Sequence, residues 1–369
     1  MKIFKRPIGE KTKILFFLIT ILLIVSCGNQ KNKKNETGQN QKDSIENLVS
    51  EGIENSKSVG LSVMIYENGK DKYFSNGYAN LETKKVIDEK TQFEIGSITK
   101  TFVALLIVIA EDEGKLLIDD PIENFFPQNT KLPKTENSKI TIKNLLVHNS
   151  GIPYKPTNID SKNEAEHYLK YTEKELLYYL KNLTLKNEPG IVYEYSLTGY
   201  GILGYILKKL YNKSLDDLIK EKITIPLGMT RTFINYCDKK DKNYADGYLK
   251  DVLTNWCRND YCVLNASGAL CSTAEDLMLF MKAQAGISET PLNKAMLKTQ
   301  EFQYKSDDYD ICLGWFKTNE FIYHPGATNG FFAIAVFNNK TKKILVMLSN
   351  TNNQKWITGI AKNEMNFPE

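Results

Sequence analysis

Apolar runs and turn residues mark the start of the folded part of the chain. Val59–Tyr66 and Lys72–Tyr78 have the composition of strands, and Asn68-Gly69 lies between them. Asparagine and glycine tolerate the positive φ angles of a tight type I′ turn, so this segment predicts a β-hairpin. A helix-like stretch near residues 43–55 precedes it.

A second pattern begins at Ser97 and continues to Gly114. This segment combines helix formers with a broad apolar face, and glycine commonly ends a helix. The region from about 120 to 290 also has mostly helical patterns. Its clearest helical segments are Leu176–Leu180, Tyr200–Leu210 and Ala274–Ala283.

Strand patterns return near the C-terminus. Phe331–Phe337 and Lys343–Ser349 are apolar runs, separated by the turn Asn338-Asn339-Lys340. Strands at both ends and helices between them predict one sheet that both ends of the chain complete. The predicted fold class is α/β (α+β), with an antiparallel sheet flanked by helices and an inserted, mostly helical region.

Composition and charge exclude one class of partner. The 369 residues are 42% hydrophobic and 25% charged, with a formal net charge of +4. Residues 1–26 alone carry five cationic side chains against Glu10, a net of +4, so the remainder is neutral. The body therefore lacks the basic excess that nucleic-acid binding requires.

The N-terminus has the pattern of a bacterial export signal. Basic residues precede the apolar run Ile14–Val25, which is too short for a comfortable membrane span, and Ser26-Cys27 follows. This ending resembles a lipobox, in which Cys27 would be lipidated and become the mature N-terminus. A plain secretory signal is the alternative. We expect a signal at 1–26, a polar tether at 27–44 and one domain at 45–369, held at a membrane and facing the periplasm or the exterior.

Five more cysteines lie beyond Cys27. Because exported proteins form disulfides, Cys257 and Cys262, which enclose a short polar loop, are the favoured pair. An odd count leaves at least one thiol free. The three histidines lack zinc-finger spacing from the cysteines, so we expect no metal site.

Ser97-Ile98-Thr99-Lys100 is the first candidate for catalysis. Positions i and i+3 lie on one helix face, so the Lys100 amine can reach the Ser97 hydroxyl. A serine hydroxyl is a weak nucleophile until a base takes its proton, and a desolvated lysine can be that base. A helix N-terminus also offers N–H groups to an oxyanion.

Two further segments are weaker signals by themselves. Tyr195 could act as a general base if a nearby lysine favoured its phenolate. His324-Pro325-Gly326-Ala327 contains a glycine suited to close backbone approach, and the Ala327 N–H could be a second oxyanion donor.

Together these segments resemble the class C β-lactamases and the related DD-peptidases and esterases. Ser97-Ile98-Thr99-Lys100 is similar to their nucleophile motif, Tyr195 to their tyrosine motif and His324-Pro325-Gly326 to their third motif. Further similar segments occur in order along residues 45–350; they are Leu145–Pro153, Pro226–Met229, Ser272–Leu277 and Leu313–Trp315.

The resemblance implies a β-lactamase/transpeptidase-like fold and an acyl-enzyme mechanism. Ser97 would attack a carbonyl, Lys100 and Tyr195 would move the proton, and the N–H groups of Ser97 and Ala327 would hold the oxyanion. His324, Gly326 and Leu197 would contact a small-molecule or peptide substrate. No metal or organic cofactor is implied.

The chain departs from the family pattern at two motifs. Leu197 stands where the tyrosine motif usually has asparagine, and His324-Pro325 stands where the lactamase form has Lys-Thr. These changes favour a less carboxylate-dependent ester or amide over penicillins. An inactive receptor for peptidoglycan fragments is the alternative function.

The other conspicuous residues are expected to be structural. These are His148 in a turn, His167 on a solvated face, and the packing residues Trp256 and Trp315.

Overall fold

The computed structural model describes residues 44–367 except 56, 137, 161, 163, 238–240, 255–257 and 307–308. The signal and tether expected at 1–44 lie outside the described residues, apart from Ser44. Trp256 and Cys257 also lie outside them. In the part of the chain that is described, no helix is both long and apolar enough to span a bilayer.

An antiparallel sheet joins the two ends of the chain. Within the described residues its order is β3-β2-β1-β14-β13-β12-β11-β10-β9, so the first long strand pairs with the last. Its strands are β1 (Gly60–Glu67), β2 (Lys70–Asn80), β3 (Lys85–Val86), β9 (Tyr304–Lys305), β10 (Asp310–Ile311), β11 (Phe316–Thr318), β12 (Phe321–Ala327), β13 (Phe332–Asn338) and β14 (Ile344–Ser349). This arrangement confirms the sheet expected from the sequence.

The described residues also form two smaller sheets outside the main one. The sheet β4-β8-β5 borders the nucleophile segment, and β6-β7 is a separate hairpin. Their strands are β4 (Phe93–Glu94), β5 (Phe233–Ile234), β6 (Tyr248–Leu249), β7 (Val252–Leu253) and β8 (Leu270–Ser272).

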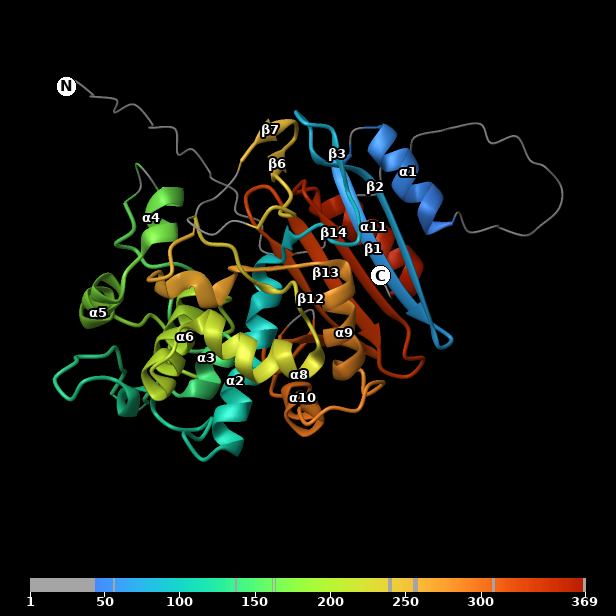
Figure 1. Cartoon of the computed structure of the whole chain (residues 1–369). Coiled ribbons are helices and arrows are strands. Elements are labelled where there is room, and N and C mark those ends of the chain that lie inside the picture. The colour runs from blue at the N-terminus through green and yellow to red at the C-terminus, as the bar shows by residue number, and fades with distance from the viewer. Residues whose placement is uncertain are drawn as a thin grey trace, which may run out of the picture. The chain divides into compact units, whose positions relative to one another are not determined.

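Helices cover both faces of the main sheet (Figure 1). Alternate residues of a strand point to opposite faces. Phe332, Ile334 and Val336 of β13 accordingly pack with α1 and α11, whereas Ala333 and Phe337 join the larger core with α2 and α9. The central strands β1, β13 and β14 are therefore buried on both faces, which explains their nearly continuous apolar sequences.

The remaining elements form the mostly helical region and the two sheet-covering layers. The helices are α1 (Ile45–Glu54), α2 (Thr99–Asp112), α3 (Ile142–Leu146), α4 (Glu164–Lys170), α5 (Glu173–Asn182), α6 (Leu197–Tyr211), α7 (Leu215–Ile219), α8 (Ile225–Leu227), α9 (Ala274–Gln284), α10 (Asn293–Thr299) and α11 (Gln354–Met365). Short turns of 3₁₀ or π type are η1 (Gly96–Ile98), η2 (Ile122–Phe125), η3 (Lys220–Thr224) and η4 (Val263–Ser267).

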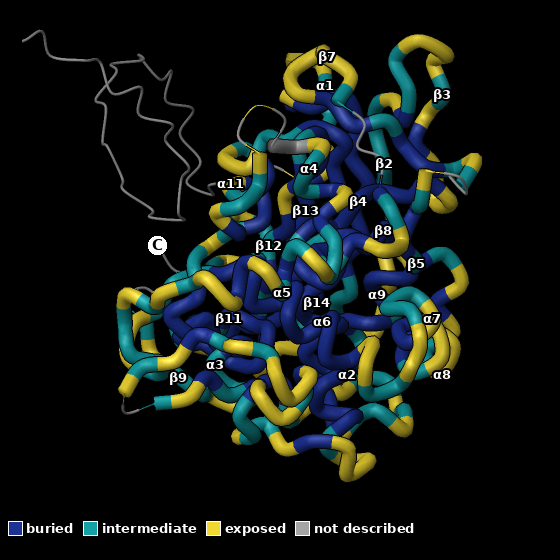
Figure 2. The backbone as a smooth tube through the Cα atoms, turned by 90° about the vertical axis from the view of Figure 1, so that its left-hand side faces the viewer, coloured by how far each residue is buried: buried dark blue, intermediate teal, exposed yellow. Residues whose placement is uncertain are grey.

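The helix α2 runs through the interior of this fold. Every residue from Thr99 to Ala110 is buried, and Figure 2 shows the α2 and α6 backbones among the buried segments. A helix that is apolar on all sides belongs in a core. Because α2 is buried along its length, the residues at its N-terminus are held in a fixed position.

The local signals in the sequence had the expected effects. Asn68 and Gly69 both have positive φ, at 52° and 79°, as the predicted hairpin turn requires. Gly114 has a φ of 68° and follows the end of α2, which confirms it as the stop of that helix.

The expected cysteine pairing is wrong. Cys262 is a free, buried thiol that donates a hydrogen bond to the Tyr168 carbonyl at 3.2 Å. Cys237 is disulfide-bonded, and its partner lies outside the described residues. Proximity along the sequence was misleading because the chain buries Cys262 under α4.

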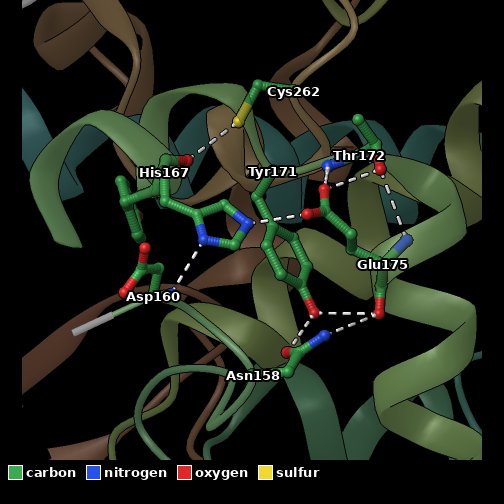
Figure 3. A network of polar contacts seen from close by, with 8 residues as sticks. Asn158, Asp160, His167, Tyr171, Thr172, Glu175 and Cys262 are labelled. Carbon is green, nitrogen blue, oxygen red and sulfur yellow. Dashed lines mark hydrogen bonds and ion pairs between the residues drawn. The ribbon is translucent and has the colours of Figure 1, made fainter. Parts of the chain in front are cut away.

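His167 is partly exposed, as a solvated face predicts, but its ring also has two specific partners. Its Nδ1 accepts the Asp160 N–H at 2.8 Å, and its Nε2 contacts the Glu175 carboxylate at 2.6 Å (Figure 3). Glu175 also accepts from the Thr172 N–H in a capping box, so His167 ties α4 to the start of α5. Trp315 is buried, as expected of a packing residue.

Candidate active site

Ser97 lies in η1, the 3₁₀ turn that leads directly into α2. It is half-buried, whereas its neighbours Gly96 and Ile98 are fully buried. Gly96 has a φ of 50°, a conformation that glycine adopts without steric cost. Within this turn, Ser97 is therefore the one residue that is partly accessible, and it presents its hydroxyl.

Lys100 is fully buried one turn further along, on the same helix face. Its Nζ lies 3.0 Å from Ser97 Oγ and donates to the Ser267 carbonyl at 2.5 Å. The Tyr195 and Tyr200 rings flank Nζ, with centroids at 4.9 and 5.5 Å. Burial holds the pKa of Lys100 well below its ordinary value, so the amine is disposed to be neutral.

Tyr195 immediately precedes Ser196, the N-cap of α6, and its hydroxyl lies beside Ser97. Ser196 caps that helix, and its hydroxyl accepts the Gly199 N–H at 2.9 Å. Burial raises the pKa of Tyr195 well above its ordinary value, while a hydrogen bond with Ser97 acts in the opposite direction. In the free protein Tyr195 is therefore a neutral phenol in contact with the Ser97 hydroxyl.

The strand β12 passes very close to η1. A Cβ added to Gly326 would lie 1.9 Å from the Ile95 oxygen and 3.1 Å from the Ser97 nitrogen. A Cβ on Gly96 would lie 2.6 Å from the Ala327 nitrogen. The two glycines thus let β12 approach η1 closely, with the backbone nitrogens of Ser97 and Ala327 beside the contact.

We expect Gly326→Ala to lower the free energy of unfolding by about 1–3 kcal/mol, because the added methyl group overpacks this contact. Gly359→Ala is the matched control, since Gly359 lies within α11 with open space around it. Alanine there should raise stability by roughly 0.5–1 kcal/mol. Urea unfolding of both variants measures the difference, and a Gly326→Ala protein as stable as the wild type would contradict the close approach.

His324 lies in β12 but is buried and uncharged. Its Nδ1 contacts the Pro325 oxygen at 2.6 Å, and its ring stacks on Phe316 at 4.8 Å. Burial lowers the pKa of His324 to about 3, so the ring is neutral at physiological pH. His324 therefore supplies no positive charge for a substrate carboxylate.

Leu197 is the first residue of α6 and is half-buried. Its backbone N–H donates to the Tyr154 oxygen at 2.8 Å, while its side chain is aliphatic. Within the described residues, no group of three or more His, Cys, Asp or Glu side chains could hold a metal ion.

Sequence reasoning missed one contact of the site. The Ser267 carbonyl in η4 binds Lys100 across 167 positions of sequence, and Tyr168 in α4 contacts the Ser267 hydroxyl at 2.6 Å. A backbone oxygen has no residue-specific signal, so no motif could have revealed it. Only the fold brings η4 against α2.

A serine at the head of a buried helix, with a buried lysine of lowered pKa one turn on and a phenol beside it, is the arrangement of a serine hydrolase. The fold and this arrangement together define that class.

The chain belongs to the Beta-lactamase family, whose model matches residues 45–359. Protein flp of Staphylococcus aureus (strain NCTC 8325 / PS 47) is 27% identical over 322 residues, covering 84% of this chain and 63% of that protein. A Beta-lactamase of Providencia stuartii is 25% identical over 352 residues, covering 85% and 86%.

A solved class C beta-lactamase is also similar in structure. It has a TM-score of 0.77 and 25% sequence identity, covering 89% of this chain and 96% of its own. The family and the fold expected from the sequence are thereby confirmed. The comparisons give no support to an inactive receptor. The chain spans less than two thirds of Protein flp, so nothing of that whole protein's role is transferred.

Proposed function

We propose that this protein hydrolyses an ester or amide through an acyl-enzyme on Ser97. One observation carries the proposal: the buried Lys100 Nζ lies 3.0 Å from Ser97 Oγ, with its pKa held well below the ordinary value. A neutral amine has one lone pair. Because the Ser267 carbonyl binds one N–H, that lone pair can accept the serine proton.

In the acylation step, Ser97 Oγ forms a bond to the substrate carbonyl carbon while its proton passes to Lys100. The N–H groups of Ser97 and Ala327 would stabilise the oxyanion, and the close approach of β12 to η1 at these two residues supports this role. The bond to the leaving group then breaks. The leaving group takes the proton from Lys100 through the Tyr195 hydroxyl, which contacts Ser97. Water releases the acyl group by the reverse proton path.

Two features of the site support a substrate that carries no essential carboxylate. His324 is neutral, and its ring is packed on Phe316. Leu197 offers no hydrogen bond to a substrate amide, and an amide buried against it would lose one. A site bordered by His324, Gly326 and Leu197 would accordingly stabilise a bound ester better than a bound penicillin.

We therefore expect a short acyl ester to be hydrolysed with a higher kcat/KM than a cephalosporin, by roughly ten- to a hundredfold, the cost of a lost hydrogen bond to a charged group. The triple variant Leu197→Asn, His324→Lys, Pro325→Thr should shift this preference toward the cephalosporin. The measurement is kcat/KM for both substrates on both proteins. A wild-type protein that already prefers the cephalosporin would refute the ester assignment.

We also propose that Cys27 is the lipidated N-terminus of the mature protein and holds the domain at a bacterial membrane. The support is the lipobox-like ending of the apolar run before it. Mass spectrometry of the protein extracted from membranes should find an acylated Cys27. A soluble mature form cleaved at another position would refute it.

A further inference from the structure

His148 is a buried histidine in the turn after α3, and it lies directly behind Tyr195. Its ring packs on the Tyr195 ring with centroids 4.3 Å apart and a tilt of 32°. Its side chain is only 3% exposed. The turn prediction for this residue was correct, but the structure adds contacts that a simple turn does not require.

The contacts of His148 flank Tyr195 along the backbone. The carbonyl oxygen of His148 accepts the Glu194 N–H at 2.7 Å. The Nδ1 of the same residue accepts the Ser196 N–H at 3.0 Å. One residue therefore binds the chain immediately before and immediately after Tyr195, while its ring covers one face of the phenol.

The backbone of His148 is in a conformation that is uncommon for residues other than glycine, although asparagine, aspartate and histidine adopt it more often than the rest. Its φ is 59°, in the left-handed region. Such strain persists where surrounding structure enforces it. Here α3 fixes the turn from one side through its Thr141–Asn144 capping box, and the Asn149 oxygen accepts the Gly190 N–H at 2.7 Å on the other.

The hydrogen-bond pattern also determines the protonation of the ring. Because Nδ1 accepts an N–H, it carries no proton of its own. Burial lowers the pKa of His148 well below its ordinary value, which agrees with a neutral ring. His148 is thus unsuited to carry a proton in the reaction without breaking its bond to Ser196.

We propose that His148 is a positioning residue, whose Nδ1 and carbonyl hold Tyr195 in hydrogen-bonding reach of Ser97. This inference rests on the proposed function, since it assigns Tyr195 to the proton path. The hydrogen bond from Ser196 is the decisive contact, because it fixes the residue next to Tyr195 at the N-cap of α6.

Two substitutions separate the acceptor from the backbone conformation. Asparagine and glycine both tolerate a positive φ, so neither adds strain at this position. His148→Asn keeps an acceptor oxygen at the place of Nδ1, whereas His148→Gly removes the acceptor and the ring. The probe is a fluorophosphonate. Two quantities are measured for each variant: the inactivation rate constant and the apparent affinity for the probe.

We expect His148→Gly to lower the inactivation rate constant by about 10- to 100-fold, with the apparent affinity unchanged, because one buried N–H loses its partner. His148→Asn should stay within roughly threefold of the wild type, since the acceptor remains. If His148 served only for packing, both variants would lose stability, and the inactivation rate constant of His148→Asn would fall together with that of His148→Gly.

A second measurement does not depend on activity. NMR of protein labelled with ¹³C-tyrosine, with the Tyr195 signal assigned through Tyr195→Phe, should show that signal shifted or broadened in His148→Gly and unmoved in His148→Asn. A folded His148→Gly protein with wild-type rate and signal would overturn the proposal, as would a folded His148→Asn protein that has lost both. If the wild type does not react with the probe at all, the proposed function fails, and the NMR signal alone decides the role of His148.

Discussion

Ser97→Ala should abolish the covalent labelling of this protein by a fluorophosphonate, a loss of about 10⁶-fold in rate if the serine is the sole nucleophile. The substitution removes only the attacking oxygen. Ser97 is half-buried, and its hydroxyl contacts Lys100 and Tyr195, so the fold of the variant should be unchanged. Intact-protein mass spectrometry of the adduct is the measurement.

A matched control distinguishes the nucleophile from other serines. Ser75 on β2 is also half-buried, and its hydroxyl donates to the Ile87 oxygen at 3.2 Å. Ser75→Ala should be labelled like the wild type. An adduct of equal yield on Ser97→Ala would remove Ser97 from its assigned role. A wild-type protein that forms no adduct with any serine probe would instead favour the inactive receptor.

Lys100→Met should lower the acylation rate by about 10²- to 10⁴-fold, the usual contribution of a general base. Methionine has a similar length and fills the same space without a titratable group. The wild-type rate should fall as pH decreases, because the protonated amine has no lone pair for the serine proton. Stopped-flow acylation of both proteins between pH 5 and 9 tests this, and a pH-independent wild-type rate would contradict it.

Lys100→Met lowers the acylation rate, but we expect it to raise the stability of the protein relative to the wild type at low pH. In the unfolded chain Lys100 is protonated below about pH 10.4, whereas burial lowers the pKa of Lys100 in the folded protein. Between these two pKa values the unfolded state binds more protons, so the free energy of unfolding contributed by Lys100 increases with pH. Thermal melts at pH 6 and pH 9 should therefore show Lys100→Met gaining in relative stability at the lower pH. An equal difference at both pH values would mean that Lys100 is protonated in the folded protein.

The sequence predicted the parts of the site that lie close together along the chain. Ser97 and Lys100 share a helix face, and a hairpin and a buried helix surround them, so local periodicity was sufficient. The sheet was predictable for a similar reason, since both ends of the chain have strand patterns. These signals depend on neighbours within a few residues.

Contacts between distant segments had no such signal. The Ser267 carbonyl on Lys100 is a backbone contact, and the two hydrogen bonds of His148 around Tyr195 depend on how the turn after α3 meets the start of α6. The charged neighbours of His167 in sequence indicated solvent, and the residue is partly exposed, but they gave no signal of its contact with Glu175. Cys262 was misjudged because a nearby cysteine suggested a bridge.

The pairing of β1 with β14 has a consequence for how the chain acquires its structure. Ser58 beside β1 contacts Ser349 at the end of β14 at 2.8 Å, across 291 positions of sequence. Loop-closure entropy makes such distant pairings slow to form. During synthesis the hairpin of β1 and β2 therefore lacks β14, the partner of β1, until nearly the whole polypeptide has left the ribosome. A chain that completes its sheet only with its last strands stays unfolded until synthesis is nearly finished, and this delay would be compatible with the membrane attachment that we propose through Cys27.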